Sequence, residues 1–269
     1  MLSGVPVVKQ RNLGILELNF LYENKIMKQD IELSVIVPCL NEEGNIADAL
    51  DILKKNLQGI NYEVIVVDDQ SSDDTVSRFH GWTKNNNVTN YHVLTKELDR
   101  RGYGAVIKYG IAYASGKYVT FYSADMVDPI HLLPQMLEMV RSHDLIQVSR
   151  YQNPDNAKSI PFKYKFYQFF YRRCVGLALG ETIADSTYAF KIFDKKKILS
   201  LGLTSNRFSI SPEIFFKGYL AGYSVAFVEG AQTHRQRGVS KFLFHKEGPG
   251  FVWCLMRAFL HRKKIIYWF

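Results

Sequence analysis

Acidic residues follow two separate β-branched and aromatic runs of this sequence, at the positions where the runs end. Asp68 and Asp69 follow the run Val64–Val67, and Asp125 follows a second run that ends at Tyr122. Carboxylates at two such positions can contact a ribose and hold a divalent metal ion on a diphosphate. Each aspartate taken singly could equally cap a helix, so only their combination indicates a site for a nucleoside diphosphate compound.

A diphosphate leaving group also requires positive charge, and basic residues gather in one glycine-containing segment. The segment from Arg235 to Lys241 reads Arg-Gln-Arg-Gly-Val-Ser-Lys, and a further arginine, Arg150, follows the run Leu145–Ser149. Fixed cations stabilise developing negative charge, because they need no reorganisation when the charge appears. These residues are therefore candidates for the phosphate-binding part of such a site.

The elements that must position these residues alternate between strands and helices. Strands are expected at residues 33–37, 63–67, 91–94, 117–122 and 145–149, and helices at residues 46–57, 74–85, 104–114 and 129–141. The alternation predicts an α/β fold whose mostly parallel open sheet is flanked by helices. Ligands of such sheets bind at the carboxyl ends of the strands, where the polar turns fall.

The pattern changes after Arg150. Residues 160–179 are expected to form an aromatic and basic helix, residues 187–192 and 223–228 two strands, residues 212–221 a helix between them, and residues 231–248 a polar loop. This part is expected to bind the acceptor, the second substrate that receives the group released from the diphosphate. We predict an N-terminal extension over 1–31, one α/β domain over 32–245 and a basic, aromatic and amphipathic helical segment over 246–269.

The composition of the 269 residues suits one domain with a substantial core, because 47% of them are hydrophobic. The net charge of +8 suggests acidic partners, which include phosphates, anionic lipid headgroups and nucleic acid. Three scattered cysteines without a CxxC pair indicate neither disulfides nor a zinc site and favour a reducing cytoplasm. Neither a secretion signal nor a membrane-spanning helix is expected, because charged residues interrupt every long apolar run.

Five motifs in unbroken order carry a resemblance to a known family. They are Pro38-Cys39-Leu40-Asn41-Glu42, Asp68-Asp69-Gln70-Ser71-Ser72-Asp73, Gly102-Tyr103-Gly104-Ala105, Ala114-Ser115-Gly116-Lys117 and Ser123-Ala124-Asp125. Together they resemble glycosyltransferase family 2 over roughly residues 33–245. The resemblance implies a GT-A fold and a nucleotide-sugar donor.

Within that family the chain is most similar to dolichyl- and polyprenyl-phosphate sugar synthases. Their later motifs are matched by Ser149-Arg150, by Asp185 with Phe190, by Glu213 and by the segment Arg235–Lys241. The resemblance implies that Asp125 holds Mg²⁺ or Mn²⁺, that Arg150 meets the acceptor phosphate, and that Asp185 and Arg235 are further catalytic residues. The implied donor-binding residues are Pro38, Leu40, Glu42, Asp68, Asp69, Ser71, Gly104, Ala124, Ser240 and Lys241.

The chain departs from the pattern of these synthases at the metal motif and on the acceptor side. Ser123 stands where the metal motif usually begins with Asp, and Val127 stands where a further metal ligand is common. Tyr164 and Gln168 occupy positions at which the synthases tend to carry Arg and Ser. The departures bear on the metal and the acceptor more than on the fold.

Acceptor chemistry separates the functions that remain open. A lipid phosphate is already an anionic nucleophile and needs cations to position it, whereas a saccharide hydroxyl needs a base, for which Asp185 or Glu213 could serve. The leading hypothesis is inverting transfer from a UDP- or GDP-sugar to a polyprenyl phosphate at the cytoplasmic face of a membrane. The alternatives are transfer to a saccharide hydroxyl in cell-surface glycan synthesis and, given Ser123, a catalytically silent nucleotide-sugar-binding module.

The C-terminal stretch from Phe251 to Lys264 mixes aromatic residues with a basic cluster. Such a stretch can lie in the headgroup region of an anionic membrane, or it can dock on the domain as a terminal helix. Nucleic acid is not an expected partner, because no recognition-helix or base-stacking motif accompanies the positive charge.

Overall fold

The computed structural model describes residues 31–269 except 96–101, 159, 234, 236 and 238–241. Residues 1–30 of the predicted N-terminal extension lie outside the described residues. So do Ser240 and Lys241, two residues of the predicted donor site.

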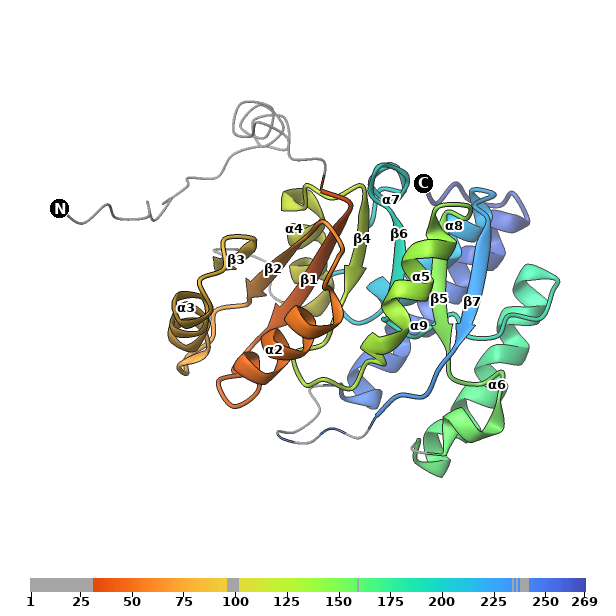
Figure 1. Cartoon of the computed structure of the whole chain (residues 1–269). Coiled ribbons are helices and arrows are strands. Elements are labelled where there is room, and N and C mark those ends of the chain that lie inside the picture. Colours follow the sequence, from red (N-terminus) through yellow and green to blue (C-terminus); the bar gives the residue numbers. More distant parts are fainter. Residues whose placement is uncertain (1–30, 96–101, 159, 234, 236, 238–241) are drawn as a thin grey trace. The chain divides into compact units, whose positions relative to one another are not determined.

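A seven-stranded sheet with the order β3-β2-β1-β4-β6-β5-β7 forms the centre of the described chain (Figure 1). Its strands are β1 Leu33–Cys39, β2 Tyr62–Asp68, β3 Tyr91–Thr95, β4 Tyr118–Phe121, β5 Leu145–Ser149, β6 Lys191–Asp194 and β7 Val225–Glu229. The described strands pair in parallel, except that β6 runs antiparallel to both β4 and β5. The predicted mostly parallel open sheet is confirmed.

Helices cover both faces of the sheet. They are α2 Ile46–Asn56, α3 Thr75–Asn86, α4 Tyr103–Tyr113, α5 Leu133–Val140, α6 Phe162–Leu179, α7 Lys195–Ser200, α8 Ile210–Leu220 and α9 Phe244–Arg262, with short 3₁₀ turns at Ile130–Leu132 and Pro154–Ala157. None of the described helices is both long and apolar enough to cross a membrane.

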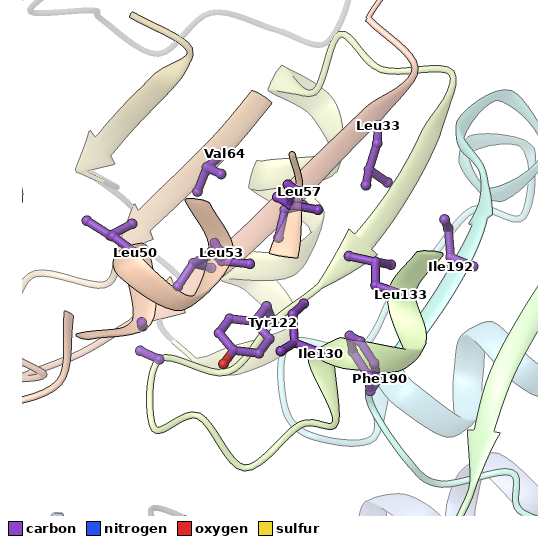
Figure 2. Packing of buried hydrophobic residues seen from close by; sticks show 14 of the residues in the cluster. Leu33, Leu50, Leu53, Leu57, Val64, Tyr122, Ile130, Leu133, Phe190 and Ile192 are labelled. Carbon is purple, nitrogen blue, oxygen red and sulfur yellow. The ribbon is translucent and has the colours of Figure 1, made fainter. Parts of the chain in front are cut away.

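Two buried clusters show how the central strands are covered. On one face, side chains of α2 and α5 such as Leu50, Leu53 and Leu133 pack against strand residues that include Val64 (Figure 2). On the other face, residues of α4, α6, α8 and α9 form the second cluster. Because β1 and β2 are covered on both sides, their sequences are almost continuously apolar, as is typical of buried parallel strands.

Strand β6 begins at Lys191, later than the strand predicted over 187–192. The backbone N–H groups of Thr187 and Tyr188 donate to Asp185 Oδ1, at 2.9 and 3.3 Å, and are therefore not used in a strand ladder. A short acidic side chain competes in this way with regular structure for neighbouring backbone groups. The strand prediction was wrong at its first residues for this reason.

Helix α9 begins at Phe244, inside the loop predicted over 231–248. Its first turns contain Glu247, whose carboxylate pairs with Arg207 at 3.1 Å and accepts the N–H of Phe208 at 3.3 Å. These contacts hold α9 on the turn before α8. They do so although Pro249 lies inside α9 and a proline would ordinarily interrupt a helix. Tertiary contacts therefore outweigh the local preference that predicted a loop.

Candidate active site

A cavity of about 1490 Å³ lies where β1, β2 and β4 end. The predicted site residues that line it are Pro38, Leu40, Glu42, Asp69, Ala124, Asp125, Arg150 and Arg235. Four other predicted residues, Asp68, Ser71, Gly104 and Asp185, are described by the structure but are not among the residues that line the cavity. The volume exceeds the roughly 300–1,000 Å³ of a pocket for one small ligand, so the cavity has room for a donor and part of an acceptor.

The two aspartates at the end of β2 have different surroundings. Asp68 is 1% exposed, and its Oδ2 accepts the N–H of Ser71 at 3.1 Å, which closes the turn. Asp69 lines the cavity, and its Oδ2 accepts the N–H of Gly102 at 3.0 Å. Ser71 Oγ accepts the N–H of Asn41 at 2.8 Å and so joins the turns after β1 and β2. Asp68 and Ser71 therefore shape the loop that presents Asp69.

The turn that begins α4 packs on the turn that begins α8. The N–H of Gly104 donates to the carbonyl of Asn206 at 3.0 Å, and a Cβ at Gly104 would lie 2.6 Å from the carbonyl oxygen of Arg207. The ring of Tyr103, which lines the cavity, stacks on Phe208 with 4.7 Å between centroids. Gly104 is thus a position of close backbone approach behind the cavity wall.

Asp125 lies in a tight turn after β4. Asp128 Oδ2 closes this turn by accepting the N–H of Ser123 at 2.8 Å. Asp125 is 8% exposed and forms an ion pair with Arg235. Within the described part of the chain, Asp125 Oδ1 has no hydrogen-bond partner. Burial raises the pKa of Asp125, and the positive charge of Arg235 opposes that rise.

The residues around Asp125 can bind a divalent cation only if a bound substrate supplies further oxygen atoms. Oδ1 is a buried carboxylate oxygen without a hydrogen-bond partner among the described residues, whereas Ser123 and Val127 add no carboxylate. The described residues contain no group of three or more His, Cys, Asp or Glu residues that could hold a metal ion. Mg²⁺ commonly binds through one or two carboxylates together with substrate phosphates. The site therefore fits a cation held jointly by Asp125 and a diphosphate.

Arg150 reaches the cavity from the end of β5 and is held there by Asp185. Its Nε donates to Asp185 Oδ2 at 2.9 Å, and a terminal nitrogen donates to Thr187 Oγ1 at 3.0 Å. Its guanidinium lies over the ring of Tyr188, 4.4 Å from the centroid. Asp185 is fully buried; burial alone would raise the pKa of its carboxyl, but Arg150 holds this pKa below its usual value. Arg150 is thus a fixed cation in the cavity wall, oriented by a buried carboxylate.

Helices α6 and α9 form the aromatic wall of the cavity. Tyr164, Tyr167, Gln168 and Tyr171 line it from α6, and the ring of Tyr167 stacks on Phe244 of α9 with 4.4 Å between centroids. Further lining residues of α9 are Phe251, Val252, Trp253, Leu255 and Met256. Sequence reasoning missed the lining role of most of these residues. The helical spacing of residues 164, 167, 168 and 171 was a signal that could have placed them on one face.

Comparison with known proteins assigns the chain to a family. The family described as Glycosyl transferase family 2 matches residues 34–210. A dolichol-phosphate mannosyltransferase of Pyrococcus furiosus is 28% identical over 217 residues, which are 78% of this chain and 59% of that protein. A dolichyl-phosphate beta-glucosyltransferase of Drosophila melanogaster is 38% identical over 102 residues, which are 35% of this chain and 31% of that protein. The chain therefore spans less than two thirds of the length of these relatives.

Solved structures show the same fold. The glucosyl-3-phosphoglycerate synthase of Mycobacterium tuberculosis, in complex with uridine diphosphate, matches with a TM-score of 0.64 at 18% identity and covers 94% of this chain and 86% of its own. A structure of the same synthase with Mn²⁺, uridine diphosphate and glucosyl-3-phosphoglycerate has a TM-score of 0.61 at 19% identity, over 95% of this chain and 86% of its own. At this identity the likeness shows the fold alone, and it confirms the expected GT-A architecture.

Proposed function

The chain belongs to glycosyltransferase family 2, and from this premise we propose that it transfers a sugar, with inversion, from a UDP- or GDP-sugar to a polyprenyl phosphate. Relatives named dolichol-phosphate mannosyltransferase and dolichyl-phosphate beta-glucosyltransferase support this acceptor class. The division of the cavity into a polar part and an aromatic part supports it independently.

The donor occupies the polar part of the cavity in this proposal. Pro38, Leu40, Glu42 and Asp69 contact the nucleotide, and Asp125 faces the diphosphate. A divalent cation bound there supplies positive charge that stabilises the departing nucleoside diphosphate. Arg235, which lines the same part, adds a second positive charge for the leaving group.

The placement of Arg150 is the observation that carries the acceptor assignment. This cation lines the cavity together with the aromatic residues of α6 and α9. A polyprenyl phosphate combines an anionic head with an apolar chain, so Arg150 can bind the phosphate while Tyr167 and Trp253 contact the first isoprene units. A phosphate oxygen is already deprotonated near neutral pH, so a fixed guanidinium has only to position the nucleophile and no base is needed.

The two residues that could serve as a base for a saccharide hydroxyl are both engaged elsewhere. Asp185 is fully buried against Arg150 and Thr187. Glu213 is 1% exposed, and its carboxylate accepts the backbone N–H groups of Thr204 and Ser205 at 2.9 and 2.7 Å. A general base must reach the proton that it removes, so this geometry disfavours the saccharide alternative.

Peripheral contact with an anionic membrane fits the outer surface of α6 and α9. Phe162 and Leu177 of α6 are 81% and 82% exposed, and Phe259 of α9 is 40% exposed; none of the three lines the cavity. Basic residues on the two helices include Lys163, Lys165, Arg172, Arg173, Arg257 and Arg262. Apolar side chains interspersed with cations suit the headgroup region of a bilayer. No disulfide joins the three cysteines, all of which the structure describes, and this agrees with a reaction at the cytoplasmic face.

Matched acceptors test the proposal. The chain is incubated with a panel of UDP- and GDP-sugars, Mg²⁺ or Mn²⁺, and one of three acceptors: a short-chain polyprenyl phosphate, the same prenyl chain as a free alcohol, or a free saccharide. We expect a glycolipid, detected by mass spectrometry, only with the phosphate. Clear transfer to a free saccharide without any glycolipid would contradict the proposal. Donor binding with neither transfer nor hydrolysis would indicate the silent module instead.

A pair of arginine variants tests the role of Arg150. Arg150→Gln should raise the KM for the polyprenyl phosphate by about tenfold or more while donor binding remains, because a charge-assisted contact to the acceptor is lost. Arg141→Gln is the matched control, since Arg141 is a surface residue that pairs with Glu32 and Glu138. Equal acceptor KM values in the two variants would exclude Arg150 from the acceptor site.

A further inference from the structure

Arg235 supplies the protein's own counter-ion for Asp125. Its guanidinium pairs with Oδ2 of that carboxylate, and the two side chains are 26% and 9% exposed. Both residues line the cavity. The arginine therefore holds the carboxylate that a divalent cation would also need.

Backbone contacts keep Arg235 beside the turn that contains Asp125. The N–H of Thr233 donates to the carbonyl of Val127 at 2.9 Å, and Thr233 Oγ1 donates to the carbonyl of Met126 at 3.0 Å. Thr233 lies two residues before Arg235, and Met126 and Val127 directly follow Asp125. The chain two residues before Arg235 is thus joined to the turn that contains Asp125, which keeps the arginine close to the carboxylate.

The small number of carboxylates makes this competition effective. Ser123 and Val127 add no carboxylate, and Asp128 uses one of its oxygens to close the turn. One or two carboxylates hold Mg²⁺ or Mn²⁺ weakly without substrate phosphates. A guanidinium on the same carboxylate reduces its negative potential and so weakens metal binding further.

We propose that Arg235 competes with the divalent cation for Asp125, and that the donor diphosphate shifts this competition by offering oxygens to both cations. The guanidinium then moves from the Asp125 carboxylate to the diphosphate, and the carboxylate becomes available to the metal ion. No covalent bond changes in this exchange. The part played by the donor rests on the proposed function, whereas the competition between Arg235 and a metal ion needs no donor.

Binding of Mn²⁺ alone tests the competition. The electron paramagnetic resonance signal of free Mn²⁺ is titrated with the wild-type chain, with Arg235→Gln and with Arg237→Gln, in the absence of any nucleotide. We expect weak binding to the wild type and binding at least about tenfold tighter to Arg235→Gln. Arg237→Gln is the matched control, because Arg237 pairs with the exposed Asp48, and it should bind Mn²⁺ as the wild type does. The double variant Arg235→Gln with Asp125→Asn should lose this gain in Mn²⁺ affinity.

Two further measurements test whether the charge of Arg235 weakens Mn²⁺ binding and what the nucleotide changes. Arg235→Lys keeps a positive charge and should bind Mn²⁺ nearly as weakly as the wild type, which would assign the gain in Arg235→Gln to the lost charge. UDP or GDP should tighten Mn²⁺ binding strongly in the wild type and much less in Arg235→Gln.

Equal Mn²⁺ affinity of the wild type and Arg235→Gln without nucleotide would overturn the proposal, as would equal gains in the Gln and Lys variants. These titrations contain no sugar and no acceptor. A failure of the glycolipid assay would therefore leave their outcome valid.

Discussion

Asp185 contacts Arg150 and not the cavity: Arg150 Nε lies 2.9 Å from Asp185 Oδ2, and Asp185 has no exposed surface. The same carboxylate accepts the backbone N–H of Thr187 at 2.9 Å, so its position is fixed by the chain as well as by the arginine. Asp185 is therefore a positioning residue for the cation that we place at the acceptor phosphate.

Replacement of Asp185 by Asn should reduce stability and acceptor binding together. The change leaves the Arg150 charge without its buried partner, which typically costs about 3–5 kcal/mol of unfolding free energy. Denaturant unfolding measures this loss, and the acceptor KM should rise because the guanidinium is no longer held in place. The control Asp48→Asn breaks the exposed pair with Arg237 and should cost no more than about 1 kcal/mol. A normal KM with a collapse of kcat would instead identify Asp185 as a base.

Glu213→Gln should destabilise the fold without a specific effect on turnover. The Glu213 carboxylate accepts the N–H groups of Thr204 and Ser205 and pairs with Lys217 at 3.1 Å, and both side chains of that pair are 1% exposed. Loss of its charge should lower the unfolding free energy by about 3 kcal/mol. The kcat per folded molecule should stay within about twofold. A fall in kcat of about 100-fold would fit a general base and favour a saccharide acceptor.

Much of the polar part of the cavity, where we propose that the donor binds, could be predicted from the sequence, because local patterns determine it. The β-branched runs that became β1 and β2 are buried on both faces, and parallel strands bring their carboxyl ends together. Asp69 and Asp125, which follow different strands, consequently line one cavity.

The residues that could not be predicted depend on contacts between distant parts of the chain. Nothing in the dipeptide Asp68-Asp69 shows that one aspartate closes a turn while the other lines the cavity. The start of α9 depends on the pairing of Glu247 with Arg207, which lies 40 residues earlier. The burial of Asp185 likewise follows from its position behind Arg150, 35 residues away in the sequence.

Gly104→Ala should disturb the part of the cavity that we propose for the donor. A Cβ there would lie 2.6 Å from the carbonyl oxygen of Arg207, so the turn before α8 must shift, at a cost of about 1–3 kcal/mol of unfolding free energy. Nucleotide binding, followed by thermal shift, should weaken because Tyr103 moves with that turn. In the control Gly81→Ala, the new methyl group meets nothing within 4 Å on α3 and should stabilise the helix by about 0.5–1 kcal/mol. Equal stability of the two variants would contradict this assignment.

The buried amine of Lys191 should make the unfolding free energy depend on pH in the alkaline range. Lys191 is fully buried on β6, its Nζ donates to the carbonyl of Ser211 at 2.8 Å, and burial lowers its pKa to about 7. An unfolded lysine has a pKa of about 10.4, so between these values the unfolded chain holds a proton that the folded chain has released. Unfolding free energy should therefore rise with pH above about 7, approaching about 1.4 kcal/mol for each pH unit.

Denaturant unfolding at pH 7 and pH 9 measures this contribution as the difference between the wild type and Lys191→Met, in which the titrating group is absent. The exposed Lys196→Met is the control and should keep the wild-type pH dependence. If Lys191→Met also kept that dependence, the amine would have to be charged in the folded protein at both pH values. A carboxylate near enough to hold the charge would then be needed, and Asp185 is the one whose negative charge already acts to raise the pKa of Lys191.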